Sequence, residues 1–151
     1  MVGTNTAQND DPQLTARLWQ GRQPLRIVLD KQLRLSNSLK LFDASAPTWV
    51  INEKKNETEG NVHYKQLSFD DLLLKSILKE LHAASILSLI VEGGAALLQS
   101  FIDEGLWDEA RVFTGNITLQ RGIKAPHING NIGEEVLSGN DRLTIFYNDL
   151  I

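Results

Sequence analysis

The segment from residue 86 to residue 102 constrains the fold more than any other part of the sequence. Residues 86–91 are apolar except for Ser88, which is typical of a parallel strand buried on both faces. Glu92 and the pair Gly93-Gly94 follow directly. Beyond the glycines, apolar residues recur at helical spacing as far as Ile102. A buried strand that turns at two glycines into an amphipathic helix predicts an α/β domain.

The rest of the chain predicts further strands, helices and loops around this unit. Strands are expected at Leu25–Asp30, Thr48–Asn52, Val62–Leu67, Trp107–Thr114 and Arg142–Asn148, and loops at residues 2–24, 53–61 and 115–141. One helix is expected from the capping pattern Ser68–Asp71 to about His82, and another over Ala95–Glu104 with Gly105 as its stop. This order predicts one α/β domain over residues 1–151, with a mostly parallel sheet and an antiparallel edge near the C-terminus.

Composition excludes several classes of protein. The 151 residues carry a net charge of −4, which argues against a nucleic-acid partner. The chain has no cysteine, so thiol catalysis and thiolate metal sites are excluded. Its three histidines are too widely spaced to favour a metal site, and we expect none. There is no apolar run long enough for a membrane span and no signal peptide, so we expect a cytoplasmic protein.

The glycine pair is the motif that carries chemistry. Ligands of open α/β sheets bind beyond the carboxyl ends of the strands, and a helix N-terminus offers unpaired N–H groups and partial positive charge to a phosphate. Gly93 and Gly94 would let the anion approach the backbone, and Glu92 would accept hydrogen bonds at the rim. The alternative is a tight strand-to-helix turn that needs glycine for its geometry alone. Gly-Gly without further glycines leaves both interpretations open.

Three blocks of sequence resemble one known family. They are residues 2–17 (VGTNTAQNDDPQLTAR), residues 24–30 (PLRIVLD) and residues 91–109 (VEGGAALLQSFIDEGLWDE). In this order they are similar to the pyrimidine reductase domain of bacterial riboflavin biosynthesis. The resemblance implies a dihydrofolate-reductase-like fold with helices on both faces of the sheet. It also implies NADPH-dependent reduction of the ribose of 5-amino-6-(5-phosphoribosylamino)uracil to a ribityl chain.

The resemblance also implies which residues form the site. The implied NADP(H) contacts are Thr6 and Asp10 in the loop before Pro12, Lys31, and the segment Gly94, Ala95, Ala96, Leu97, Leu98, Gln99 and Ser100. The implied substrate contacts are Leu14, Arg17 and Glu92. A guanidinium can bind a phosphate through two hydrogen bonds, so Arg17 is a chemically reasonable contact for the substrate phosphate. No catalytic group is assigned, although Glu92 and Asp10 are candidates for a general acid.

The chain departs from the family pattern at its start. The family domain begins with a strand, a nucleotide loop and a helix upstream of Val2, and the cysteine ligands of its companion zinc deaminase domain have no counterpart. We therefore expect an N-terminally incomplete reductase domain that forms a homodimer. Two alternatives stay open: a non-catalytic remnant that keeps part of the nucleotide cleft, and an unrelated phosphate-binding α/β domain.

Overall fold

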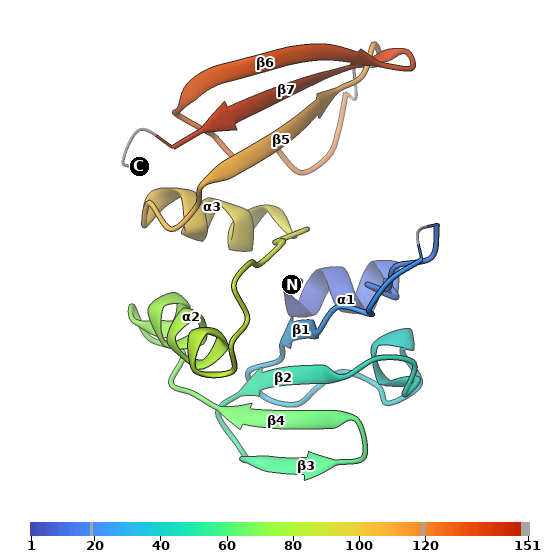
Figure 1. The fold of residues 1–151 in the computed structure, drawn as a ribbon, viewed down its shortest axis with the longest axis vertical. Helices are drawn as coiled ribbons and strands as arrows, with labels where there is room; N and C mark the ends of the chain where they lie inside the picture. Colours follow the sequence, from blue (N-terminus) through green and yellow to red (C-terminus); the bar gives the residue numbers. More distant parts are fainter. Residues whose placement is uncertain (19, 119, 149–151) are drawn as a thin grey trace. The chain divides into compact units, whose positions relative to one another are not determined.

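The computed structural model describes residues 1–18, 20–118 and 120–148 (Figure 1). The chain divides into two compact units, Met1–Gly94 and Ala95–Ile151. Each unit has a sheet of its own. The expectation of a single domain over residues 1–151 stays a prediction. Among the residues described, no helix has the length and apolar character needed to cross a membrane.

The first unit contains a four-stranded sheet in the order β1-β2-β4-β3 (Figure 1). Strands β1 (Arg26–Leu29), β2 (Thr48–Asn52) and β4 (Val62–Gln66) are parallel, as predicted. Strand β3 (Glu57–Glu59) pairs antiparallel with β4, although residues 53–61 were expected to be a loop. Gly60 makes the difference, because its φ of +58° permits the tight turn that folds this polar segment back onto β4.

Helices cover both faces of this sheet, as predicted. Helix α1 (Thr4–Asp10) buries Ala7 in a cluster on one face with Val28, Val50 and Tyr64. Side chains alternate along a strand, so Lys65 points from the opposite face. There its Nζ lies 3.1 Å from Glu80 of helix α2 (Leu73–Ala83). Helix α2 therefore lies over the second face and buries its apolar stripe, which consists of Leu74, Ile77 and Leu81.

Two helix starts differ from the predictions. The N-terminal segment 2–24 was expected to be loop, but Thr4–Asp10 forms α1. Helix α2 begins at Leu73 and not in the capping pattern Ser68–Asp71. At that point the Asp70 carboxylate accepts a hydrogen bond of 2.9 Å from the Leu72 N–H. An aspartate that bonds the backbone two residues on forms a turn, and this turn delays the helix.

A buried arginine closes the N-terminal end of β1. The Arg26 side chain has no exposed surface, and its guanidinium lies 2.9 Å from the Asp43 carboxylate. It also donates to Thr48 Oγ1 and to the Lys40 and Ala46 carbonyls. These bonds hold the segment around the 3₁₀ turn η1 (Lys40–Phe42) against the sheet.

The expectation of a fully buried central strand at Ile86–Val91 is wrong. The segment has no strand ladder, and the side chains of Leu87 and Ile90 are 91% and 74% exposed. At its start the Ile86 N–H donates to the Leu81 carbonyl, and at its end the Met1 amino group donates to the Ile90 carbonyl and the Glu92 N–H donates to the Met1 carbonyl. A strand is buried on both faces only when layers cover it, and most of this segment has no such cover in the described residues.

The second unit consists of one helix and a three-stranded antiparallel sheet in the order β5-β7-β6. Helix α3 (Ala95–Asp103) ends as predicted, with Gly105 at φ +64° and the Leu106 N–H bonded to the Phe101 carbonyl. Strands β5 (Glu109–Thr114) and β7 (Asp141–Tyr147) match two predicted strands. The predicted antiparallel strands near the C-terminus are therefore present, but they form a sheet separate from the parallel one.

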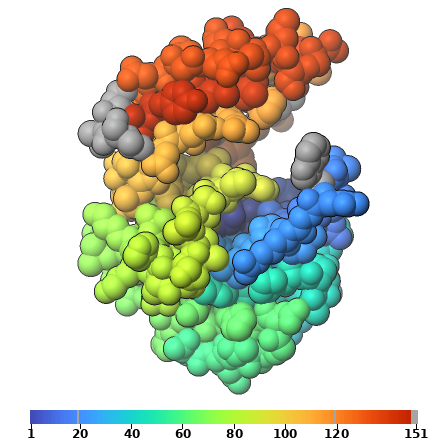
Figure 2. Space-filling model, viewed as in Figure 1, coloured from blue at the N-terminus to red at the C-terminus, as the bar shows by residue number. Residues whose placement is uncertain are grey.

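Strand β6 (Asn131–Ser138) lies in the stretch 115–141 that was expected to be loop. Glycines suggested the loop, yet Gly133 sits at an irregularity of the β6–β7 ladder, where a Cβ would overlap the ring of Tyr147. This glycine therefore makes room for an aromatic ring and does not mark a loop. Every residue of β6 is exposed, and the strand forms much of the orange and red surface in Figure 2.

Candidate functional site

The candidate site begins where the N-terminal segment meets the glycine pair, within the first unit. Val2 pairs in parallel with both Val28 of β1 and Gly93. The Val2 N–H donates to the Ile27 carbonyl at 3.0 Å, and the Gly3 N–H donates to the Gly93 carbonyl at 2.9 Å. These bonds bring the start of α1 beside a glycine that is distant in sequence.

Thr6 is the predicted cofactor residue that lies against the glycine pair. It projects from α1, and a Cβ built on Gly94 would come 3.0 Å from Thr6 Oγ1. Two residues earlier, Thr4 Oγ1 donates a hydrogen bond of 2.5 Å to the Leu29 carbonyl at the end of β1. The sequence did not single out Thr4, because a threonine in a polar stretch carries no pattern. The hydrogen bond of Thr4 links α1 to the carboxyl end of β1, where α/β proteins bind ligands.

The remaining predicted residues of the N-terminal block lie farther along the same segment. Asp10 is the last residue of α1, so both it and Thr6 lie on a helix and not in the predicted loop. Leu14 follows with φ +50° and packs against the buried cluster on the α1 face. Arg17 is exposed, and its Nη1 donates to Gln13 Oε1 over a long 3.4 Å.

Lys31 lies in the turn directly after β1. Its ammonium is 3.4 Å from the Glu53 carboxylate and 5.6 Å from the centre of the Phe69 ring. The side chain is about half exposed, so it can exchange this partner for a stronger anion. The lysine is thus a usable cation for a phosphate, although neither neighbour was predicted to belong to the site.

Glu92 is exposed just before Gly93, and its carboxylate lies near the Met1 amino group. Burial lowers the pKa of that amino group to about 6, and the charge of Glu92 opposes this shift. Both candidates for a general acid, Glu92 and Asp10, are on the surface. Across residues 1–18, 20–118 and 120–148, no three metal-binding side chains gather into a cluster.

The segment 95–100 forms the start of α3 in the second unit. Leu97 is buried, whereas Ala96 and Ser100 are exposed, and Ser100 Oγ donates back to the Ala96 carbonyl. The Gln99 amide exchanges two hydrogen bonds with the backbone of His127, of 2.8 Å and 3.2 Å. Gln99 therefore anchors the loop before β6, which the prediction of a cofactor contact did not anticipate.

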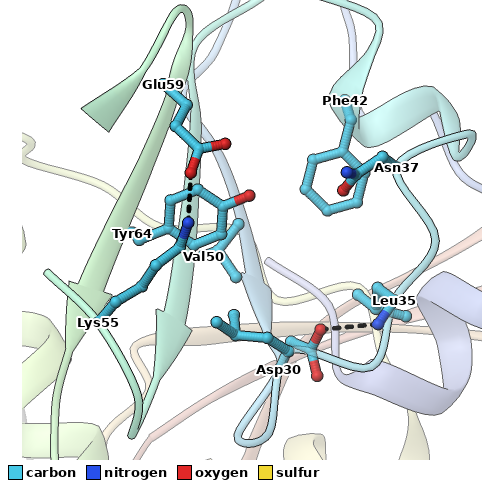
Figure 3. Close-up of a pocket in the computed structure, with 9 residues that line it drawn as sticks. Asp30, Leu35, Asn37, Phe42, Val50, Lys55, Glu59 and Tyr64 are labelled. Atoms are coloured by element: carbon cyan, nitrogen blue, oxygen red, sulfur yellow. Dashed lines mark hydrogen bonds and ion pairs between the residues drawn. The ribbon is translucent and has the colours of Figure 1, made fainter. Parts of the chain in front are cut away.

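Each unit also has a cavity. The one in the first unit, of about 330 Å³, is lined by the residues drawn in Figure 3: Asp30, Leu33, Leu35, Asn37, Phe42, Val50, Lys55, Glu59 and Tyr64. The charged groups that line this cavity have partners within the protein. Asp30 accepts hydrogen bonds from two backbone N–H groups, and Lys55 forms ion pairs with Glu57 and Glu59. The cavity of the second unit, of about 380 Å³, contains one predicted residue, Gln99. Neither cavity is therefore the centre of the predicted site.

Comparison with known proteins gives one consistent result. The family model described as the RibD C-terminal domain matches residues 1–124. The riboflavin biosynthesis protein RibD of Aquifex aeolicus is 39% identical over 128 residues, which are 82% of this chain and 36% of that protein. The 2,5-diamino-6-ribosylamino-4(3H)-pyrimidinone 5′-phosphate reductase of Archaeoglobus fulgidus is 32% identical over 135 residues, which are 79% of this chain and 62% of that protein. The chain thus spans less than two thirds of either relative.

A solved structure agrees with these relatives. The Thermotoga maritima diaminohydroxyphosphoribosylaminopyrimidine deaminase/5-amino-6-(5-phosphoribosylamino)uracil reductase has a TM-score of 0.83 and 27% identity, covering 97% of this chain and 44% of that one. Acinetobacter baumannii RibD has a TM-score of 0.82 at 21% identity, which supports the fold alone. The predicted dihydrofolate-reductase-like α/β class is therefore confirmed.

Proposed function

The chain belongs to the RibD C-terminal domain family, and from this membership we propose that it is an NADP(H)-dependent reductase of riboflavin biosynthesis. Its proposed substrate is 5-amino-6-(5-phosphoribosylamino)uracil, whose ribose would be reduced to a ribityl chain. The printed names of the archaeal relative and of the Thermotoga protein support this substrate class.

The observation that carries the proposal is the contact between Thr6 and Gly94. A Cβ at Gly94 would crowd Thr6 Oγ1, so the glycine lets this threonine lie close to the backbone at the point where α3 is about to begin. The N–H groups of the first turn, from Ala95 onward, suit the cofactor pyrophosphate. Lys31 would meet the 2′-phosphate of NADP. The cofactor would supply the hydride, and the protein would supply orientation.

The proposed substrate contacts are Arg17, Glu92 and Leu14, a cation, an anion and an apolar side chain. Arg17 makes no ion pair with a carboxylate among the residues described, so its guanidinium is available for the ribose 5′-phosphate. Glu92 offers hydrogen-bond acceptors to substrate hydroxyl or amine groups. Leu14 contributes an apolar contact.

The protein is also proposed to be a cytoplasmic homodimer. Sedimentation at micromolar concentration tests the dimer, which should appear as a species of twice the chain mass.

The cofactor part is tested by a matched pair of glycine substitutions. Gly94→Ala should weaken NADPH binding by about 10-fold or more, since the new methyl group crowds Thr6 and blocks the close approach of the cofactor. Gly122→Ala is the control, because its methyl group would meet no atom within 4 Å and Gly122 lies outside the proposed cofactor contacts. Fluorescence titration measures both, and equal affinity for NADPH in the two variants would contradict the proposed cradle.

Cofactor selectivity tests Lys31 separately. Lys31→Ala should weaken NADPH binding more than NADH binding, because only NADPH carries the 2′-phosphate. Lys54→Ala, a nearby exposed lysine, is the control. An equal loss for both cofactors would remove Lys31 from the proposed site.

The reaction itself is tested by the loss of NADPH absorbance in the presence of the substrate. Turnover by the chain supports the proposal. Binding of NADPH without turnover would favour the alternative of a non-catalytic remnant that keeps the nucleotide cleft.

A further inference from the structure

The loop between α1 and β1 carries both of the proposed substrate residues, Leu14 and Arg17. Its described residues form no helix or strand from residue 11 to residue 25. A side chain on such a loop is placed only as well as the loop backbone is held. The bonds that hold this backbone therefore bear directly on substrate binding.

The first half of the loop is anchored by Asp11. Its carboxylate accepts a hydrogen bond of 2.7 Å from the Lys40 N–H and lies 3.4 Å from the Lys40 ammonium. Leu14 then adopts φ +50°, a conformation that leucine rarely occupies without support from its surroundings. Its packing against the buried cluster supplies that support.

The second half is held by the side chain of Gln23. Its Oε1 accepts a hydrogen bond of 3.0 Å from the Ala16 N–H, and its Nε2 donates one of 3.1 Å to the Ala16 carbonyl. One neutral amide thus satisfies both backbone groups of a residue seven positions earlier, as a neighbouring strand would. Ala16 is the residue directly before Arg17, so the clamp sets the direction in which Arg17 leaves the backbone.

We propose that Gln23 is a positioning residue for the phosphate end of the substrate, acting through Ala16 on the guanidinium of Arg17. This inference rests on the proposed function, because it assigns Arg17 to the substrate phosphate. Among the residues that the structure describes, the Arg17 side chain has only the 3.4 Å bond to Gln13, so its orientation depends on the backbone. Glutamine alone among side chains of its length both donates and accepts here.

The first test replaces the donor and keeps the length. In Gln23→Glu a carboxylate oxygen faces the Ala16 carbonyl, and this repulsion opens the clamp. We expect KM for the ribosylaminopyrimidine phosphate to rise by about 10-fold, with kcat and the Kd for NADPH changed by less than about 2-fold. Gln20→Glu adds the same charge at an exposed position of the same loop and should leave KM unchanged. An unchanged KM in Gln23→Glu would overturn the proposal.

A double-mutant cycle tests whether Gln23 acts through Arg17. Arg17→Ala should itself raise KM, and adding Gln23→Glu to it should raise KM by less than about 2-fold more, since the guanidinium to be positioned is gone. Rises in KM that multiply fully would show that Gln23 acts independently of Arg17, and would overturn the proposed role.

Hydrogen exchange separates failure of the clamp from failure of the proposed function. In Gln23→Ala the Ala16 amide loses its acceptor and should exchange faster, whereas Gln20→Ala should leave it unchanged. If exchange at Ala16 does not respond, the clamp is absent and the inference is wrong even in an active enzyme. If exchange responds but the parent chain neither binds nor reduces the substrate, the proposed function has failed and the positioning role falls with it.

Discussion

The parallel sheet of the first unit and the antiparallel sheet of the second are built in opposite ways. Every residue of β2 is buried, because helices lie over both faces of its sheet and strands lie on both sides. Every residue of β6 is exposed, and this strand is the edge of its sheet. The first sheet is therefore held by burial of apolar surface. The second depends on its ladder and on a few close fits between backbone and aromatic rings.

Because of this difference, ion pairs affect the stability of the fold more in the first unit than in the second. In the first unit, the buried Arg26 needs several partners, because an unpaired buried charge is costly. In the second unit the ion pair between Arg111 and Glu109 lies on the surface, where it contributes little. Substitutions of the same chemical type should therefore have very different consequences in the two sheets.

The largest contrast is expected from two isoleucines. Ile51 of β2 has no exposed surface, so Ile51→Ala should lower the free energy of unfolding by about 2–5 kcal/mol. Ile132 of β6 is 61% exposed, and Ile132→Ala should change it by no more than about 0.5 kcal/mol. Urea unfolding followed by circular dichroism measures both. Similar losses would mean that β6 is covered in solution.

A smaller contrast is expected from two glycines of the second unit. An alanine methyl group at Gly130 would lie 2.6 Å from the Tyr147 carbonyl and 2.8 Å from the Trp107 ring, so Gly130→Ala should cost about 1–3 kcal/mol. A methyl group at Gly122 would meet no atom within 4 Å, and Gly122→Ala should be neutral or slightly stabilising. Hydrogen exchange in β7 reports the loss. If Gly130→Ala leaves this exchange unchanged, the close fit does not hold the sheet.

The smallest effect is expected from pH. Hydrogen bonds from Ser45, and then from Arg26, lower the pKa of Asp43 from 3.8 to about 2. A carboxyl group with a depressed pKa stabilises the fold above its unfolded-state pKa, and this contribution is lost as the pH falls from 3.8 toward 2. Asp43→Asn should therefore flatten the dependence of unfolding free energy on pH in this window. An unchanged pH dependence in Asp43→Asn would contradict the assignment to Asp43.

In both regions the sequence predicted some elements and missed others. The strands at Arg26–Leu29 and Thr48–Asn52 and the end of α3 at Gly105 follow from local patterns, and the structure has them there. Strand β6 did not follow from its pattern, because its glycine fits under the ring of a residue on another strand. The prediction of a buried strand at Ile86–Val91 failed for a similar reason. Apolar composition gives a segment a tendency to be buried, but it does not supply the layers that would cover that segment.

By itself, the sequence determined the α/β class, the family and the residue types available for phosphate, because these depend on local periodicity and on short motifs. Only the tertiary structure decided that Thr6 lies against Gly94, that Gln99 anchors the backbone at His127, and that Gln23 holds Ala16. Each of these contacts joins residues whose separation in the chain carries no periodic signal. A glutamine in a polar loop looks the same whether it is solvated or clamped, because its partner is a backbone group that any residue could supply.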